Sequence, residues 1–165
     1  TGVVNPTAYT AVRVTKNRKI GVIGTAATVN SHSYKLRIQK LLPGAEVMEQ
    51  ACPLFVPLVE NGIIRRDDQI TRLVVRRYMQ ELKDNGVDTV ILGCTHFPFA
   101  KREIRAVLGP RPVFFDGAVG EAKYTKVVLE ERKLRAPDDA VGGIRFESSD
   151  PQKIGLLEQL FAFDL

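Results

Sequence analysis

Short runs of apolar residues alternate with longer segments in which apolar residues recur at helical spacing along most of this chain. Such alternation is typical of a parallel sheet whose strands are joined by helices, so the sequence predicts an α/β fold. The predicted strands are residues 19–24, 45–50, 87–93, 113–117 and 144–148. The predicted helices are residues 31–42, 53–59, 67–84, 98–108, 118–134 and 150–163.

Length and composition place the chain among ordinary globular proteins. Its 165 residues predict one domain or at most two small ones, and 44% hydrophobic with 26% charged residues argues against a disordered or fibrous chain. No apolar run approaches the roughly 20 residues that span a bilayer, and the first ten residues lack the pattern of a signal peptide. We therefore expect a cytoplasmic protein without a membrane partner.

The net charge of +5 is unevenly distributed. Residues 1–45 hold seven Lys and Arg and no acid: Arg13, Lys16, Arg18, Lys19, Lys35, Arg37 and Lys40. These charges are dispersed among aliphatic residues without interleaved aromatics that would stack on bases, which favours a solvated face over a nucleic-acid interface. An acidic partner surface or an anionic small substrate would also suit this stretch.

The two cysteines, Cys52 and Cys94, are too few for a disulfide framework and are predicted to be free thiols. The chain has two histidines, His32 and His96, so a structural zinc site would need all four residues at irregular spacings. We therefore predict no metal site.

Three short segments follow the first three predicted strands: residues 24–28, 51–53 and 93–96. Ligands of open α/β sheets bind outside the carboxyl ends of the strands, so these segments are candidates for one shared site. Cys94 directly precedes a predicted helix, whose N–H groups and dipole would stabilise a thiolate, and His96 is close enough to relay a proton. The pattern indicates a thiol acting as base or nucleophile, or else a small buried cysteine that ends a core strand.

Other polar residues of these segments allow two interpretations each. The turn containing Thr25 and Thr28 would bind an anion through N–H groups and hydroxyls, although N-capping by Thr28 explains it equally well. This turn matches neither a Walker A loop nor a dinucleotide fingerprint. Glu60 would orient a histidine or be a solvated acid at a helix end, and Cys52 is interpreted as a structural thiol.

Three of these segments resemble motifs of one family. Residues 91–98, ILGCTHFP, resemble the second catalytic-cysteine motif of bacterial glutamate racemases. Residues 21–29, GVIGTAATV, are similar to the threonine turn of that family, and residues 50–60, QACPLFVPLVE, to the segment between the two. Order and spacing agree, and the similarity runs from about residue 20 to residue 116 and more weakly to the last helix.

The resemblance implies a cofactor-independent isomerase that interconverts L- and D-glutamate and supplies D-glutamate for peptidoglycan, cell-wall biogenesis and cell shape. Two thiols would act on opposite faces of the α-carbon. It implies that Cys94 is one of these acid/base thiols, that His96 assists it and that Glu60 positions His96. Thr95, His96, Thr25 and Thr28 would bind the substrate, and the protein would form a homodimer.

The resemblance also implies two α/β lobes, with residues 1–112 forming the lobe that carries Cys94 and residues 113–165 an incomplete part of the other. The family's first catalytic cysteine, in a Cys-Asn-Thr motif, has no counterpart here, and Cys52 matches a non-catalytic position. We therefore expect a truncated form, or a chain that needs a second copy or a complementary piece, with apolar surface exposed after residue 113. Two alternatives stay open: a one-thiol decarboxylase of the same superfamily, and a non-catalytic interaction module that uses the basic N-terminal face.

Overall fold

The structure is a computed structural model that describes residues 2–64 and 68–162. The chain divides into two compact units, Thr1–Ala122 and Lys123–Leu165. The first unit contains the sheet and the candidate site residues, and the second contains only helices and irregular segments within its described residues. Each unit is considered by itself.

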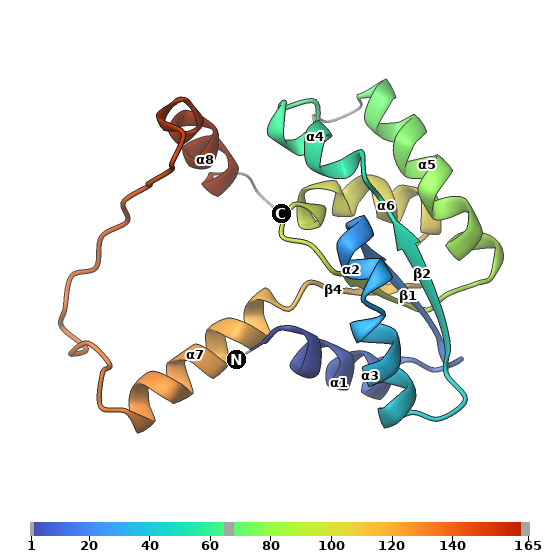
Figure 1. Cartoon of the computed structure of the whole chain (residues 1–165), viewed down its shortest axis with the longest axis horizontal. Coiled ribbons are helices and arrows are strands. Elements are labelled where there is room, and N and C mark those ends of the chain that lie inside the picture. Colours follow the sequence, from blue (N-terminus) through green and yellow to red (C-terminus); the bar gives the residue numbers. More distant parts are fainter. Residues whose placement is uncertain (1, 65–67, 163–165) are drawn as a thin grey trace. The chain divides into compact units, whose positions relative to one another are not determined.

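Four parallel strands form the sheet of the first unit (Figure 1): β1 Lys19–Gly24, β2 Glu46–Ala51, β3 Thr89–Leu92 and β4 Val113–Phe115. Their order is β2-β1-β3-β4, so β1 and β3 are the inner strands. Ile20 pairs with Val47 on one side and with Thr89 on the other. β3 is buried along its whole length, as its continuous apolar sequence indicates for a strand covered on both faces. The predicted α/β fold is confirmed.

Eight α-helices and two 3-10 turns are described with these strands. The helices are α1 Val4–Val14, α2 Ala26–Asn30, α3 Ser33–Leu41, α4 Phe55–Glu60, α5 Gln69–Asp84, α6 Lys101–Leu108, α7 Ala118–Glu131 and α8 Ile154–Phe161. The 3-10 turns are η1 Phe97–Ala100 and η2 Pro151–Lys153. Asp68 begins α5 by accepting a hydrogen bond from the Thr71 N–H at 2.8 Å, which is the N-cap role that its side chain favours.

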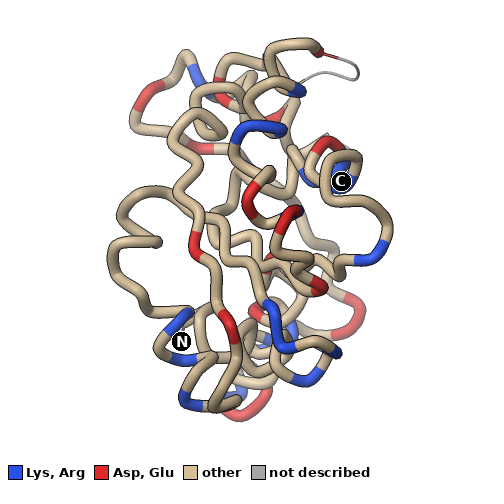
Figure 2. The backbone as a smooth tube through the Cα atoms, turned by 90° about the vertical axis from the view of Figure 1, so that its right-hand side faces the viewer, with Lys and Arg blue, Asp and Glu red and all other residues tan. Residues whose placement is uncertain are grey.

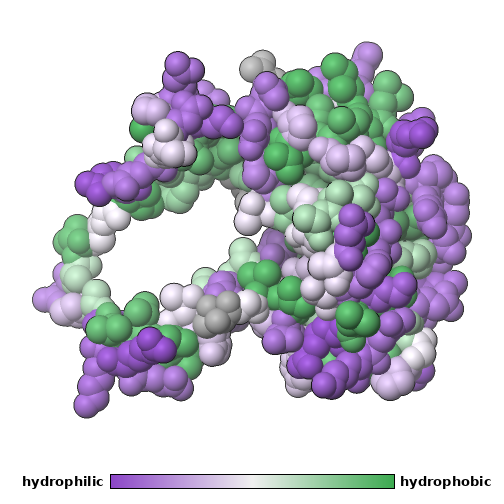
Figure 3. Space-filling model, in the orientation of Figure 1, coloured by the Kyte–Doolittle hydropathy of each residue, from purple (hydrophilic) through white to green (hydrophobic). Residues whose placement is uncertain are grey.

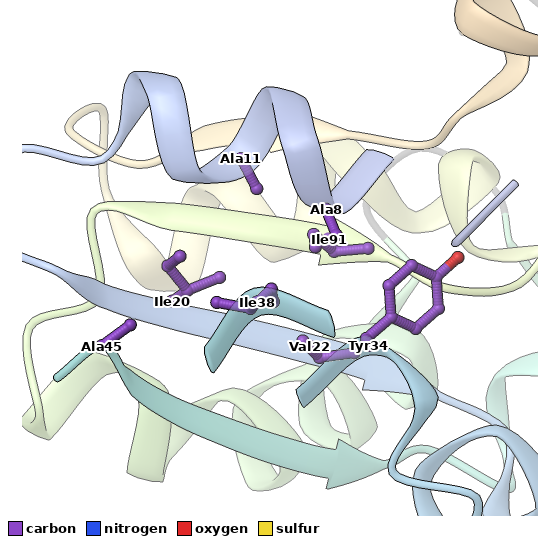
Figure 4. Packing of buried hydrophobic residues seen from close by; sticks show 8 residues of the cluster. All are labelled: Ala8, Ala11, Ile20, Val22, Tyr34, Ile38, Ala45 and Ile91. Atoms are coloured by element: carbon purple, nitrogen blue, oxygen red, sulfur yellow. The ribbon is translucent and has the colours of Figure 1, made fainter. Parts of the chain in front are cut away.

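Helices cover both faces of the sheet, because successive side chains of a strand point to opposite faces. On one face, Ile20 and Val22 of β1 pack with Ala8 and Ala11 of α1 and with α3 (Figure 4). On the other face, a Cβ atom at Gly21 would meet Leu82 of α5 at 2.6 Å. The core therefore consists of two apolar layers with the sheet between them.

Helix α1 was not predicted, although Val4, Ala8 and Ala11 have the spacing of one helical face. Asp88, directly before β3, fixes the segment after this helix. Its carboxylate accepts hydrogen bonds from the Thr15 hydroxyl at 2.7 Å and from the Lys16 and Asn17 N–H groups at 2.6 and 2.7 Å. These bonds join the beginning of β1 to the beginning of β3.

The predicted strand 144–148 is wrong, because these residues have no regular structure and Ile144 is exposed. A strand needs a neighbour for its N–H and C=O groups, and the described part of the C-terminal unit offers no other strand. Phe146 instead packs edge-on against Phe161 of α8, with ring centroids 5.5 Å apart. Two further predictions, the helix start at Asp67 and the helix end at Phe163, lie outside the described residues.

The first unit extends beyond the lobe boundary expected at residue 112, because β4 pairs with β3 in the same sheet. In the C-terminal unit none of the described residues is buried. Figure 3 shows hydrophobic surface along this unit, in keeping with the expected exposed apolar side chains. The large ones are Tyr124, Val127, Leu129, Leu134, Val141, Ile144 and Phe161. Within the described ranges, no helix has the length and apolarity needed to cross a membrane.

Candidate functional site

The three segments singled out in the sequence meet at the carboxyl edge of the sheet. The Cys52 N–H donates to the Gly24 carbonyl at 2.9 Å, and the Gly93 N–H donates to the Ile23 carbonyl at 2.8 Å. Because β1 lies between β2 and β3, the turn after β1 is adjacent to both other segments. The sheet therefore brings residues 24–28, 51–53 and 93–96 to one place.

The threonine turn forms the N-terminus of the short helix α2. Thr25, not Thr28, is the N-cap, and its hydroxyl accepts the Thr28 N–H at 3.3 Å. The two hydroxyl oxygens are 3.1 Å apart and hydrogen-bonded to each other. Capping of the helix therefore explains part of the turn. The capping residue is Thr25, however, and not Thr28, which the sequence interpretation had named. Both side chains are half-buried.

Cys94 lies two residues beyond the end of β3, and its side chain is half-buried. Its Sγ is 3.8 Å from Nδ1 of His96. Thr95, between them, is exposed and places its Oγ1 3.4 Å from the same nitrogen. Residues 94–96 therefore present a thiol, a hydroxyl and an imidazole nitrogen around one point.

Glu60, the last residue of α4, contacts the other side of the imidazole. Its Oε1 is 3.4 Å from His96 Nε2, and the two side chains are partly exposed, 39% for Glu60 and 28% for His96. An ionised carboxylate only accepts hydrogen bonds, so this contact favours the proton on Nε2 and leaves the Nδ1 lone pair facing Cys94. Phe55 of α4 packs edge-on against Phe97, with ring centroids 5.0 Å apart, and this pair holds α4 beside residues 94–96.

Cys52 differs from Cys94 in its burial. It is fully buried, and burial raises the pKa of its thiol to about 12. Its Sγ lies 3.6 Å from the Gln50 carbonyl oxygen, in hydrogen-bond contact. At neutral pH this thiol stays protonated, and it therefore serves as a small core residue.

Tyr34 is a neighbour of the site that the sequence did not reveal. Its ring is buried in the apolar cluster on the α1 and α3 face, and one ring edge lies beside Gly93, the residue before Cys94. The helical spacing of Tyr34, Ile38 and Leu41 predicts a buried face, but it does not say that this face reaches the end of β3.

The basic residues beside β1 lie at the opposite end of the strand from the candidate site. Lys16, Arg18 and Lys19 lie at the amino end of that strand, whereas Cys94 follows the carboxyl end of its neighbour β3. Figure 2 shows segments with Lys and Arg and segments with Asp and Glu in several parts of the molecule. In the described part of the chain, no group of three His, Cys, Asp or Glu residues is arranged to hold a metal ion.

Comparison with known proteins identifies relatives of the whole chain. Glutamate racemase of Sulfurihydrogenibium sp. is 39% identical over 163 residues, which are 99% of this chain and 56% of that protein. The chain spans about half the length of the curated relatives that it matches.

Two solved structures show the same fold. That of glutamate racemase from Thermus thermophilus in complex with beta-chloro-D-alanine superposes with a TM-score of 0.77 at 38% identity, covering 96% of this chain and 57% of that one. That of the Francisella tularensis enzyme in complex with D-glutamate gives 0.71 at 32% identity, covering 80% and 48%. The family model described as Asp/Glu/hydantoin racemase matches residues 1–119. The chain therefore belongs to the Asp/Glu/hydantoin racemase family.

Proposed function

We propose that this chain carries one of the two acid/base groups of a glutamate racemase, an isomerase that works without a cofactor. The observation that carries the proposal is the chain of contacts from Glu60 through His96 to Cys94 at the carboxyl edge of the sheet. The names of the relatives and the D-glutamate in one related structure support glutamate as the substrate.

In the proposed reaction, Cys94 removes the α-proton. His96 Nδ1 accepts the thiol proton, and Glu60 stabilises the resulting imidazolium through Nε2. The thiolate then takes the substrate proton: the Cα–H bond breaks, an S–H bond forms, and the electron pair is delocalised into the substrate carboxylate. Cys94 Sγ and His96 Nδ1 are 3.8 Å apart, and we expect this distance to shorten when substrate is bound.

Hydroxyl groups around the thiol are the proposed substrate ligands. Thr25 and Thr28 expose a bonded hydroxyl pair at the N-terminus of α2, and Thr95 is exposed beside His96. Hydroxyls donate hydrogen bonds to carboxylate oxygens, so this arrangement suits an acidic amino acid. We assign Thr95, His96, Thr25 and Thr28 to substrate binding.

Complete inversion needs a second acid on the opposite face of the α-carbon. Cys52, the other thiol of the chain, is excluded by its burial and its raised pKa. We propose that the second group comes from another polypeptide segment, supplied by a longer form of this chain, by a complementary chain or by a second copy in a homodimer. We also propose that the complete enzyme has two lobes, with residues 1–112 in the lobe that carries Cys94 and with residues 123–165 in the other. Strand β4 pairs with β3 and so extends the first lobe beyond the boundary expected at residue 112. Supply of D-glutamate for peptidoglycan in the cytoplasm is the corresponding cellular role.

Deuterium exchange tests the proposal. L- and D-glutamate are incubated separately with the chain in D₂O; mass spectrometry measures α-deuteration and chiral chromatography measures inversion. We expect deuterium in one enantiomer only, without inversion, because a lone base reaches one face. Cys94→Ser should abolish exchange and Cys52→Ala should retain it. Glu60→Gln, which keeps the shape but not the charge, should slow exchange about tenfold or more. Exchange with neither enantiomer, or racemisation by a monomer, would contradict the proposal.

The single accessible thiol also favours a second candidate, a one-thiol decarboxylase of the same superfamily. Such an enzyme protonates a planar intermediate from one face, and Cys94 alone would suffice. A prochiral disubstituted malonate distinguishes the two. Release of carbon dioxide and one enantiomer of the product would support the decarboxylase. Biological activity that survives Cys94→Ser would instead support a non-catalytic interaction module.

A further inference from the structure

Tyr34 links the apolar core to the backbone that carries Cys94. The residue lies in the first turn of α3, and its side chain is 5% exposed. Its ring belongs to the cluster with Val22, Ile38 and Ile91. Figure 4 shows the ring at the end of this cluster where the strands terminate, with the hydroxyl oxygen pointing away from the other labelled side chains. The ring is therefore anchored in the core at the edge of the candidate site.

The Tyr34 ring lies on the side of Gly93 toward which a side chain would project. A Cβ atom built on Gly93 would be 3.3 Å from Tyr34 Cε2, 3.4 Å from Thr28 Cγ2 and 2.9 Å from the Ile23 carbonyl oxygen. The Gly93 N–H donates to that same carbonyl at 2.8 Å. Gly93 is thus enclosed by the end of β1, the Thr28 methyl group and the tyrosine ring. Its own lack of a side chain is what allows this approach.

Gly93 and Thr28, which approach each other here, are both connected with the proposed site. Gly93 is bonded covalently to Cys94, so a displacement of Gly93 displaces Sγ relative to His96. Thr28 contributes one of the paired hydroxyls. A displacement of about 1 Å at a catalytic group lowers rates by up to about a hundredfold. The tyrosine ring and the Thr28 methyl group therefore both limit the position of Gly93, and through it that of Cys94.

We infer that Tyr34 is a positioning residue, whose ring fills the space beside Gly93 so that the Cys94 thiol stays aligned with His96. This inference rests on the proposed function for its consequence in turnover. The alignment itself is a property of the folded chain and is measurable without substrate. The ring carries the role, because the atom nearest to the space beside Gly93 is a ring carbon, whereas the hydroxyl points away from the other labelled side chains in Figure 4.

Three variants separate positioning from general stabilisation. Tyr34→Leu removes the ring edge that contacts Gly93. Tyr34→Phe keeps the ring and removes the hydroxyl. Ile38→Ala is the matched control, because Ile38 is fully buried in the same cluster and one turn further along α3, but it is not among the atoms nearest to Gly93. Denaturant unfolding of all three first establishes that Tyr34→Leu and Ile38→Ala are folded and gives the stability that each has lost.

The primary measurement is the pH profile of Cys94 alkylation by iodoacetamide, with His96→Gln as the reference for an uncoupled thiol. We expect the profile of Tyr34→Leu to converge on that of His96→Gln, while Tyr34→Phe and Ile38→Ala keep the wild-type profile. If Tyr34→Leu keeps the wild-type profile, or Ile38→Ala changes it equally, the positioning role is refuted.

The second measurement is α-deuteration of glutamate, analysed as kcat and KM. Tyr34→Leu should lower kcat about tenfold with KM little changed, and Tyr34→Phe should restore it to within about twofold. A kcat loss in Tyr34→Leu no larger than that in Ile38→Ala would overturn the inference. If the wild-type chain exchanges no α-proton, the proposed function fails, whereas the alkylation profiles still decide the role of Tyr34.

Discussion

The two cysteines show how environment sets the chemistry of one residue type. Cys94 follows the inner strand β3 at the carboxyl edge of the sheet, and its neighbour is an imidazole nitrogen of His96. Cys52, at the same edge of the sheet, is fully buried and hydrogen-bonded to a main-chain carbonyl. A thiolate, not a thiol, is the base and the nucleophile, so burial decides between the two residues.

Alkylation tests this difference directly. Iodoacetamide at pH 8 should modify Cys94 and leave Cys52 unmodified in the folded chain, because burial raises the pKa of Cys52 to about 12 and excludes the reagent. Mass spectrometry of proteolytic peptides measures both sites. In guanidinium chloride the two cysteines should react alike. Modification of Cys52 at a comparable rate under native conditions would show that the first unit opens around β2.

Gly93 offers a second test at the scale of one residue. In Gly93→Ala the new methyl group would lie 2.9 Å from the Ile23 carbonyl oxygen, a backbone atom that cannot rotate away. We expect a loss of about 1–3 kcal/mol in the free energy of unfolding, as for other overpacked cores. Gly21→Ala is the comparison variant, since its methyl group would meet only side-chain atoms: Leu82 Cδ2 at 2.6 Å, Leu82 Cγ at 3.3 Å and Val90 Cγ2 at 3.6 Å. Equal losses in the two variants would contradict the argument.

At the scale of elements, strands and helices of strong periodicity could be predicted from the sequence. Residues 19–24 form the predicted strand, and β3 lies within the predicted 87–93, because apolar runs ended by small residues mark buried strands. The strand at 144–148 failed because a strand depends on a partner that no local pattern supplies. Helix α1 was missed because its buried residues are mostly alanines, which give a weak apolar signal.

The candidate site likewise has residues that could be predicted from the sequence and residues that could not. Cys94, His96 and the threonine turn could be selected because they follow predicted strands and resemble family motifs. The position of Glu60 beside His96 depends on the packing of Phe55 against Phe97, and the role of Thr25 as N-cap depends on where α2 begins. Tyr34 contacts Gly93 only through the tertiary fold. The Phe55–Phe97 pair and the approach of Tyr34 to Gly93 join residues far apart in the sequence, and no local pattern encodes them.

Asp88 makes the join between α1, β1 and β3 dependent on pH. Burial raises the pKa of its carboxyl, but hydrogen bonds from Thr15, Asn17, Lys16 and Thr89 outweigh burial and lower it below 3.8. A lowered pKa stabilises the fold above the unfolded-state value, and this contribution is lost as the pH falls through the folded-state value. Asp88→Asn should therefore lower the free energy of unfolding by about 1–3 kcal/mol near pH 7, and by less below pH 3.8.

Urea unfolding of the wild type and Asp88→Asn from pH 7 to pH 3 measures this difference. The control is Asp84→Asn, since Asp84 is exposed at the end of α5 and bonds only to Gln80 in the described structure. Asp84→Asn should change the free energy of unfolding only slightly at every pH. A constant difference between Asp88→Asn and the wild type over the whole range would contradict the assigned role of the carboxylate.

At the scale of the whole molecule, the two units differ in how much surface they bury. The first unit has a sheet with apolar layers on both faces, and the described part of the second has no buried residue. Local opening is easiest where few apolar side chains are removed from water. Stability should therefore be concentrated in the residues of the sheet.

Hydrogen exchange measures this distribution. Amides of β1 and β3 should exchange about a thousandfold or more slowly than those of residues 123–162, since global opening of a domain costs about 5 kcal/mol or more. The measurement is repeated over a range of protein concentrations. Protection in residues 123–162 that persists at high dilution would contradict the expectation, and protection that grows with concentration would reveal a second copy covering the apolar side chains.

The order of the sheet also has a consequence for synthesis. Strand β1 lies between β2 and β3, yet it precedes both in the chain. A ribosome therefore releases β1 well before the neighbour that completes its pairing has been translated. During that interval one hydrogen-bonding edge of an apolar strand stays open in the nascent polypeptide, which makes this stage of biosynthesis the one most exposed to aggregation.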